Sequence, residues 1–336
     1  MSGSLSQWQG DATDATTGFH CGLASIGGWT STLCAQSSSR RYRIGMLDTS
    51  ARHLNPNLRH LEQALRERGY IEGQNLTFEY RSPDGRNESF AELATELVHL
   101  NVDVIVTRGT PAALAAKAAS ATVPVVMAAA GDPRAIIRGG PAPSANLTGF
   151  GAFALGAERK RVEILKTMLA KVERVAALMN LSNPSRRSEW KEIEAGARSV
   201  GVEAQVLDAR TVTDLEQSFD SATRWRADAL VVGSDTLVQT NQSLVLGLAA
   251  THRLPSIYTF RDFVDAGGLV SYGVSLPDLY RRAADYVDRI LKGAKPEALP
   301  VEPPRRFETI INLNTARALG LTLPSALLSA ADEVVE

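Results

Sequence analysis

Two short polar turns follow apolar segments and carry residue types that could bind a small charged molecule. Gly109, Thr110 and Pro111 follow one apolar run, and proline in this position is typical of the first turn of a helix. The N-H groups at a helix N-terminus favour a carboxylate. Asp235 follows a second apolar run and would offer a carboxylate to an ammonium group. Together the turns fit a zwitterion, although Thr110 and Asp235 could each act only as a helix cap.

The two turns occupy corresponding places in an internal repeat. The run VDVIVT at 102–107 returns as ADALVV at 227–232, and each copy leads to a second apolar strand opened by Pro124 or Pro255. The repeat predicts two similar lobes. Ligands of open α/β sheets bind at the carboxyl ends of the strands, so we expect a ligand cleft lined from both lobes.

Other candidates follow the remaining predicted strands. Thr49 and Ser50, next to Asp48, follow the first strand and could extend the carboxylate site, while turn formation is the commoner role for Asp132. Asn180 and Asn183 could bind either the ligand or their own turn. Aromatic rings at 150, 258, 260 and 272 lie near expected crossings between lobes, where they could cover an apolar ligand body or pack in the core. The candidate ligand-binding residues are Thr49, Ser50, Gly109, Thr110, Gly131, Asp132, Asn180, Asp235, Tyr258 and Tyr272.

Strands alternate with helices from residue 41 onward, which predicts a doubly wound parallel sheet in each lobe. Strands are expected at 42–47, 76–80, 102–107, 124–127, 175–179, 202–207, 227–232 and 255–258. The glycine-flanked segment 267–273 suits a crossing between lobes. We assign 41–150 plus 273–295 to the first lobe and 151–272 plus 296–336 to the second.

Composition favours a globular protein that binds no nucleic acid. The 336 residues include 44% hydrophobic ones, and the net charge is -1, so no sequence-wide basic field is present. Both cysteines lie in the first 39 residues, which contain no lysine or arginine. We interpret residues 1–40 as a leader or a disordered tail, because Ala35-Gln36 could serve as a cleavage point but the basic start of an export signal is missing.

The sequence carries no recognisable catalytic motif. It contains no nucleophile elbow, no His-Glu-x-x-His helix, no phosphate-binding loop and no Cys-x-x-Cys pair, and its five histidines are scattered. We therefore expect neither enzymatic activity nor a cofactor or metal.

Seven short segments carry a family resemblance: GYIEGQN at 69–75, GTPA at 109–112, GDP at 131–133, NLTG at 146–149, GGLVSYG at 267–273, LKGAKP at 291–296 and ALGLTLP at 318–324. Together they resemble the ABC transporter substrate-binding proteins of the tryptophan/tyrosine-binding type. The resemblance extends from Arg41 to Glu336 and implies a type I periplasmic binding-protein fold, in which two doubly wound lobes joined by three crossings hold a ligand between them. It also implies a cleaved export signal, from which residues 1–39 depart.

Taken together, these observations predict the periplasmic solute-binding component of an ABC importer. We expect a monomer that binds an aromatic or other apolar amino acid and delivers it to a membrane permease. The alternative is a ligand-sensing module of a signalling or regulatory system, since one fold can serve several functions. An α/β enzyme acting in the cleft is a third possibility, which the missing catalytic motifs disfavour.

Overall fold

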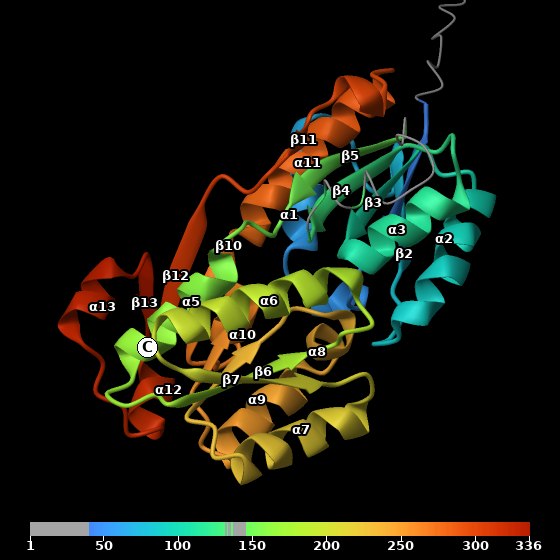
Figure 1. Cartoon of the computed structure of the whole chain (residues 1–336). Coiled ribbons are helices and arrows are strands. Elements are labelled where there is room, and N and C mark those ends of the chain that lie inside the picture. Colours follow the sequence, from blue (N-terminus) through green and yellow to red (C-terminus); the bar gives the residue numbers. More distant parts are fainter. Residues whose placement is uncertain (1–39, 132, 134–135, 137–145) are drawn as a thin grey trace, which may run out of the picture. The chain divides into compact units, whose positions relative to one another are not determined.

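The computed structural model describes residues 40–131, 133, 136 and 146–336, so the predicted N-terminal leader lies outside the described part except for Arg40. The described chain forms two α/β lobes, each built on its own sheet (Figure 1). We call lobe 1 the part that contains β1 to β5, β11, α1 to α3 and α11. Lobe 2 contains β6 to β10, β12, β13, α5 to α10, α12 and α13. The prediction of two doubly wound lobes is confirmed.

The sheet of lobe 1 is parallel throughout its described strands. Its order is β11-β5-β4-β3-β1-β2, with β3 at the centre between β1 and β4. Its central strands are almost entirely apolar because helices cover both faces of the sheet. The strands are β1 (Tyr42–Leu47), β2 (Leu76–Arg81), β3 (Val104–Arg108), β4 (Val125–Ala130), β5 (Leu147–Gly151) and β11 (Val301–Glu302).

The sheet of lobe 2 repeats that strand order and adds an antiparallel edge. Its order is β13-β12-β10-β9-β8-β6-β7, so the repeated runs form the equivalent strands β3 and β8. The predicted sheet is parallel, but β12 runs antiparallel to β10, with Val270 opposite Ile311. The strands are β6 (Arg174–Met179), β7 (Glu203–Asp208), β8 (Ala229–Val232), β9 (Ser256–Tyr258), β10 (Val270–Val274), β12 (Phe307–Asn312) and β13 (Glu333–Val335).

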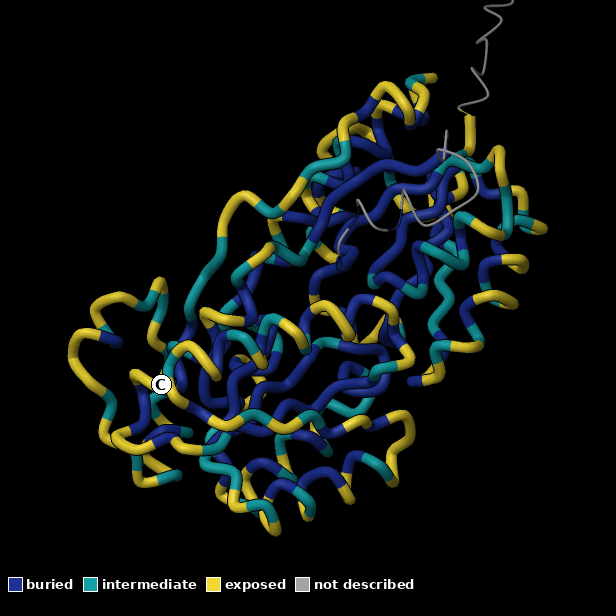
Figure 2. Tube along the Cα trace, viewed as in Figure 1, coloured by how far each residue is buried: buried dark blue, intermediate teal, exposed yellow. Residues whose placement is uncertain are grey.

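Helices bury each sheet from both sides (Figure 2). In lobe 1, α1 and α11 pack on one face and α2 and α3 on the other. In lobe 2, α5 and α6 cover one face and α7 and α9 the other. The helices are α1 (Leu58–Glu67), α2 (Phe90–His99), α3 (Thr110–Ala119), α5 (Ala157–Met168), α6 (Pro184–Ser199), α7 (Val212–Arg224), α8 (Thr236–Thr240), α9 (Gln242–Thr251), α10 (Arg261–Asp265), α11 (Leu276–Leu291), α12 (Leu313–Ala318) and α13 (Ser325–Ala330), with single 3-10 turns η1 (Arg52–Leu54), η2 (Asn87–Ser89) and η3 (Pro296–Ala298).

The chain crosses between the lobes three times, from β5 to α5, from β10 to α11 and from β11 to β12. One stretch differs from the expected division. The segment 296–336 was assigned to the second lobe, but β11 pairs with β5 and therefore belongs to the sheet of lobe 1. A strand of two residues has too little periodicity to be recognised in the sequence. No helix within the described ranges is long and apolar enough to cross a bilayer.

Candidate functional site

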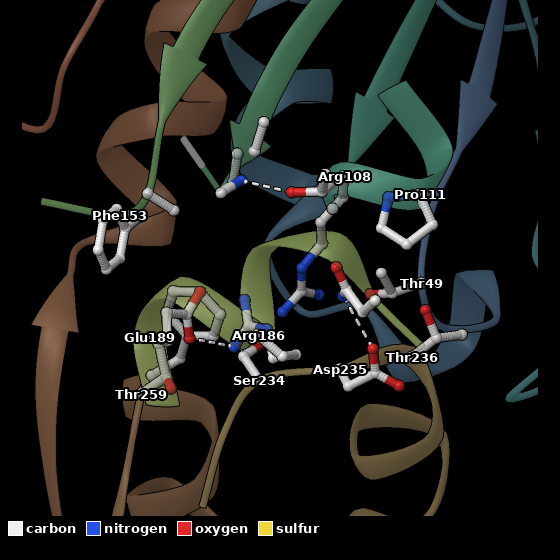
Figure 3. A pocket seen from close by; sticks show the side chains of 18 of the residues that line it. Thr49, Arg108, Pro111, Phe153, Arg186, Glu189, Ser234, Asp235, Thr236 and Thr259 are labelled. Carbon is white, nitrogen blue, oxygen red and sulfur yellow. Dashed lines mark hydrogen bonds and ion pairs between the residues drawn. The ribbon is translucent and has the colours of Figure 1, made fainter. Parts of the chain in front are cut away.

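A pocket lies between the lobes, at the carboxyl ends of strands from both sheets (Figure 3). Its space is about 610 Å³, including the part open to solvent. The residues that line the pocket are Thr49, Arg108, Gly109, Thr110, Pro111, Ala129, Ala130, Gly131, Ala152, Phe153, Ala157, Glu158, Arg161, Asn183, Arg186, Glu189, Ser234, Asp235, Thr236, Thr259 and Phe260.

The first predicted turn lies at the pocket, with a different local role for its threonine. Gly109, with φ of 88°, is the N-cap of α3, and Thr110 is the first residue of the helix. The Thr110 hydroxyl accepts a hydrogen bond from the Gly131 N-H at 3.0 Å, which ties the turn after β3 to the turn after β4. A Cβ at Gly131 would lie 2.6 Å from Thr110 Oγ1 and 2.8 Å from Ser185 Cβ of lobe 2. Because Gly109 is the N-cap and the Thr110 hydroxyl binds Gly131 instead, the alternative of Thr110 as a plain helix cap is wrong.

Arg108, which we did not predict, directs its guanidinium into the pocket from the end of β3 (Figure 3). The residue is only 3% exposed. Its Nη1 lies 3.8 Å from Asp48 Oδ1, and its Nη2 lies 3.7 Å from Asp262 Oδ2 of lobe 2 and donates to Gln239 Oε1 at 3.3 Å. Burial alone would lower the pKa of Arg108, but Tyr280 and the carboxylates of Asp48 and Asp262 raise it by more. The net pKa is therefore above its usual value, and the side chain stays charged.

The turn after β1 contributes one pocket residue and one supporting network. Thr49 lines the pocket, whereas Ser50 does not and instead binds Asp48 through its N-H at 3.1 Å. Asp48 is fully buried and also accepts hydrogen bonds from Asn55 Nδ2 at 2.9 Å and the Tyr280 hydroxyl at 2.8 Å. Because this network fixes Asp48 beside Arg108, we infer that it positions the guanidinium.

Asp235 lines the pocket and is also the N-cap of α8. Its Oδ1 accepts hydrogen bonds from Asn180 Nδ2 at 3.0 Å and the Leu237 N-H at 3.2 Å. Its Oδ2 accepts from Asn183 Nδ2 at 2.9 Å and from Asn87 Nδ2 of lobe 1 at 3.3 Å. A carboxylate has about four acceptor positions. All of them are used here, and Asn180 lies behind Asp235 rather than on the pocket wall.

A cluster of four buried charges lines the pocket from lobe 2, and we name it the lobe 2 charge cluster. Glu158 and Arg161 of α5 form one ion pair, and Arg161 Nε also donates to the Tyr272 carbonyl at 2.8 Å. In α6, Arg186 Nη1 lies 2.5 Å from Glu189 Oε2. All four residues are less than 10% exposed. Burial, opposed by Arg186 and reinforced by Glu158, raises the pKa of Glu189 to about 8.

Two members of this cluster have buried polar atoms that no described residue satisfies by a hydrogen bond. They are Glu158 Oε2 and the Nε and Nη1 atoms of Arg186; Nη1 makes its ion pair with Glu189 without hydrogen-bond geometry. Buried polar atoms are nearly always paired in native proteins. The pocket wall therefore offers one acceptor and two donors without a hydrogen bond to any described residue. A ligand that carries both hydrogen-bond donors and acceptors could pair with them.

Of the four aromatic residues considered in the sequence, Phe260 lines the pocket, whereas Phe150, Tyr258 and Tyr272 do not. Tyr258 is 1% exposed and stacks on Phe263 at 4.7 Å inside the core of lobe 2, so the core-packing alternative holds. Tyr272 stacks on Phe307 at 5.5 Å and contributes only its carbonyl, to Arg161. Phe153, which the sequence analysis did not single out, lines the pocket together with Phe260. Asp132 lies outside the described residues.

Direct contacts between the lobes surround the pocket. Asn57 Nδ2 of lobe 1 donates to Asp262 Oδ2 at 3.0 Å, and the Thr240 hydroxyl donates to the Thr49 carbonyl at 3.3 Å. With the contacts of Arg108 and Asn87, four hydrogen bonds described here join the two walls. The lobes are therefore in contact around the pocket.

The sequence contained one usable sign of the missed residues. Arg186 lies in the first turn of α6, after the N-cap Asn183, where the helix dipole disfavours a cation. Such a placement indicates a local acidic partner or a bound anion. Glu158 carries no such sign, because an acidic residue in a first turn is ordinary.

Among the described residues, no group of three His, Cys, Asp or Glu side chains could hold a metal ion.

Comparisons with known proteins agree with this architecture. A family model described as ABC transporter substrate binding protein matches residues 53–335. A tyrosine-binding protein of Clostridioides difficile (strain R20291) is 24% identical over 266 residues, which cover 79% of this chain and 76% of that protein. The structure of an ABC domain in complex with L-Trp from Streptococcus pneumonia has a TM-score of 0.79 and 25% identity, over 88% of this chain and 100% of that one. A conserved domain protein from Vibrio cholerae has a TM-score of 0.80 and 24% identity over the same shares.

Proposed function

We propose that this chain, which belongs to the ABC transporter substrate-binding protein family, binds a single zwitterionic amino acid in the pocket between its lobes. The observation that carries the proposal is the charge on the two walls. Lobe 1 supplies the Arg108 guanidinium and the N-terminus of α3, and lobe 2 supplies carboxylates and further guanidinium groups. A molecule with both a carboxylate and an ammonium group complements such a pocket.

The ligand carboxylate belongs, in this proposal, near Arg108 and the first turn of α3. The guanidinium is charged and buried, and an Arg fork can donate two hydrogen bonds to one carboxylate. The N-H groups at the start of α3 add partial positive charge. Since Asp48 and Asp262 lie more than 3.5 Å from the guanidinium, its donors are not fully used by these neighbours.

An aromatic amino acid is the ligand class that we favour. One relative is named a tyrosine-binding protein, and the structure of another contains L-Trp. In this chain, Phe153 and Phe260 line the pocket and could pack against an apolar ring. We further propose an extracytoplasmic location, a permease of an ABC importer as the protein partner, a monomeric state and no turnover of the ligand.

A binding screen tests this function directly. Purified protein is titrated calorimetrically with the twenty amino acids, and with a sugar and a purine nucleoside as controls. We expect one site per chain and the tightest binding for tryptophan or tyrosine, together with a ligand-dependent rise in melting temperature. Binding of the sugar or the nucleoside with no heat from any amino acid would refute the amino-acid proposal.

A variant pair adds a residue-level test to the screen. Arg108→Gln should weaken binding of the preferred amino acid, because one partner of a buried charge pair is removed. Arg198→Gln is the control, since Arg198 lies on α6 with 77% of its side chain exposed. Its affinity should match that of the parent. Equal affinities for the parent and both variants would show that the ligand carboxylate does not bind Arg108.

A further inference from the structure

Glu158 differs from Asp235, another acidic residue of the pocket wall, because it still has an acceptor to offer. The four acceptor positions of Asp235 are occupied by three asparagine amides and one backbone N-H. By contrast, Glu158 Oε1 pairs with Arg161, whereas Oε2 has no hydrogen-bond partner among the described residues. Of these two carboxylates, only Glu158 can accept a new donor without breaking an existing bond.

The open oxygen of Glu158 is held in place and withdrawn from solvent. The residue is 2% exposed, and its partner Arg161 is anchored in turn on the Tyr272 carbonyl at 2.8 Å. A buried acceptor without a donor is unfavourable. A ligand that supplies the donor relieves this cost, and the rigid support means that little side-chain entropy is lost on binding.

The neighbours of Glu158 match the rest of an α-amino acid. Burial raises the pKa of Glu189, and the charge of Glu158 together with a side-chain hydrogen bond to Glu158 raises it as well. Arg186 is paired with Glu189. Arg186 Nε is an open donor that lines the same pocket. An open acceptor beside an open donor fits a ligand whose ammonium group lies next to an acceptor, and the main contact of the ligand carboxylate remains that with Arg108 of lobe 1.

We propose that Glu158 is the residue that recognises the ammonium group of the ligand, through its unpaired Oε2, and that Asp235 is not. This inference rests on the proposed function and names the group that selects amino acids over acids without an amine. It predicts that the pocket discriminates strongly against a ligand in which the ammonium is missing, because Oε2 would then stay buried without a donor.

The test compares three indole ligands on three proteins by calorimetry. The ligands are L-tryptophan, indole-3-propionic acid, which lacks the ammonium, and tryptamine, which lacks the carboxylate. The proteins are the parent, Glu158→Gln and the control Glu163→Gln, whose residue lies on the same helix with 40% of its side chain exposed. If tyrosine binds tighter than tryptophan, the corresponding phenol series is used.

The parent should bind L-tryptophan about 100-fold tighter than indole-3-propionic acid. Glu158→Gln should lose about 100-fold in affinity for L-tryptophan. Its affinity for indole-3-propionic acid should change less than threefold, and Glu163→Gln should behave as the parent. An Asp235→Asn variant should keep most of the preference for the amino acid.

Several results would overturn the inference, and they are distinct from failure of the proposed function. Equal binding of L-tryptophan and indole-3-propionic acid by the parent would overturn it without any variant, which matters if Glu158→Gln does not fold. A folded Glu158→Gln protein that keeps the preference, or that loses affinity for both ligands equally, would also overturn it. If no amino acid binds the parent, the proposed function itself is wrong and the inference falls with it.

Discussion

Replacing Asp235 with alanine should reduce stability before it reduces binding. The sequence alone suggested a ligand contact or a helix cap for this residue, and the structure shows a cap with four hydrogen bonds. Three of these come from lobe 2 itself. In Asp235→Ala, the amides of Asn180 and Asn183 and the first turn of α8 all lose their acceptor, whether or not a ligand is present.

The size of the effect follows from these contacts. Loss of an N-cap costs about 1 kcal/mol, and each buried amide left without an acceptor costs about 1 to 3 kcal/mol. Allowing for partial relaxation, we expect the free energy of unfolding to fall by about 3 to 5 kcal/mol. For a chain of 336 residues that corresponds to a melting temperature about 4 to 7 °C lower.

Urea unfolding and thermal melts of the ligand-free protein measure this loss. The matched control is Asp220→Ala, whose side chain is 62% exposed on α7 and whose removal should change the unfolding free energy by less than about 0.5 kcal/mol. Asn87→Ala removes only the 3.3 Å contact from lobe 1 and should have a smaller effect than Asp235→Ala. An Asp235→Ala protein as stable as the parent but unable to bind the amino acid would refute this reasoning and make Asp235 a ligand contact.

Three other predictions concern packing, protonation and motion. Gly273→Ala should destabilise the protein severely, because a Cβ there would lie 1.8 Å from the Thr259 carbonyl oxygen, while the control Gly247→Ala in α9 meets no atom within 4 Å and should stabilise by about 0.5 to 1 kcal/mol in urea unfolding. Burial raises the pKa of Glu189 to about 8, so the folded state keeps a proton that the unfolded chain releases at lower pH; the unfolding free energy should fall as pH rises from about 5 to 8, and a slope unchanged in Glu189→Gln would contradict this. Small-angle scattering should show a smaller radius of gyration with ligand, and an equal radius at saturation would indicate a rigid cleft.

The strands could be predicted because most of them are continuous apolar runs buried on both faces. The predicted strand at 42–47 has the same bounds as β1. The strand predicted at 102–107 is β3, which begins two residues later and ends one residue later. The buried strand β5 was not predicted, because its sequence LTGFG contains two glycines and no continuous apolar run. The strands β11, β12 and β13 were missed because they lie near the sheet edge away from the repeat, with half-buried residues and no clear alternation. Their pairing is decided by tertiary contacts, which a local pattern does not contain.

The site was predicted where it depends on strand ends and missed where it depends on helix packing. Thr49, Gly109, Thr110 and Asp235 all line the pocket, because turns after parallel strands meet at one edge of the sheet. The lobe 2 charge cluster escaped notice, since charged residues in the first two turns of a helix usually face solvent. Only the packing of α5 against α6 over the pocket turns these charges inward.

The missing side chain at Gly131 sets how near the two lobes can come. A Cβ at this position would be 2.8 Å from Ser185 Cβ on the opposite wall, too close for the present contact to form. A larger residue would therefore act as a wedge that favours the separated state, and a ligand would then have to supply the extra free energy of closure. Natural selection or an engineer could thus retune how tightly the protein holds its ligand, at a position that leaves the charged groups, and with them the choice of ligand, unaltered.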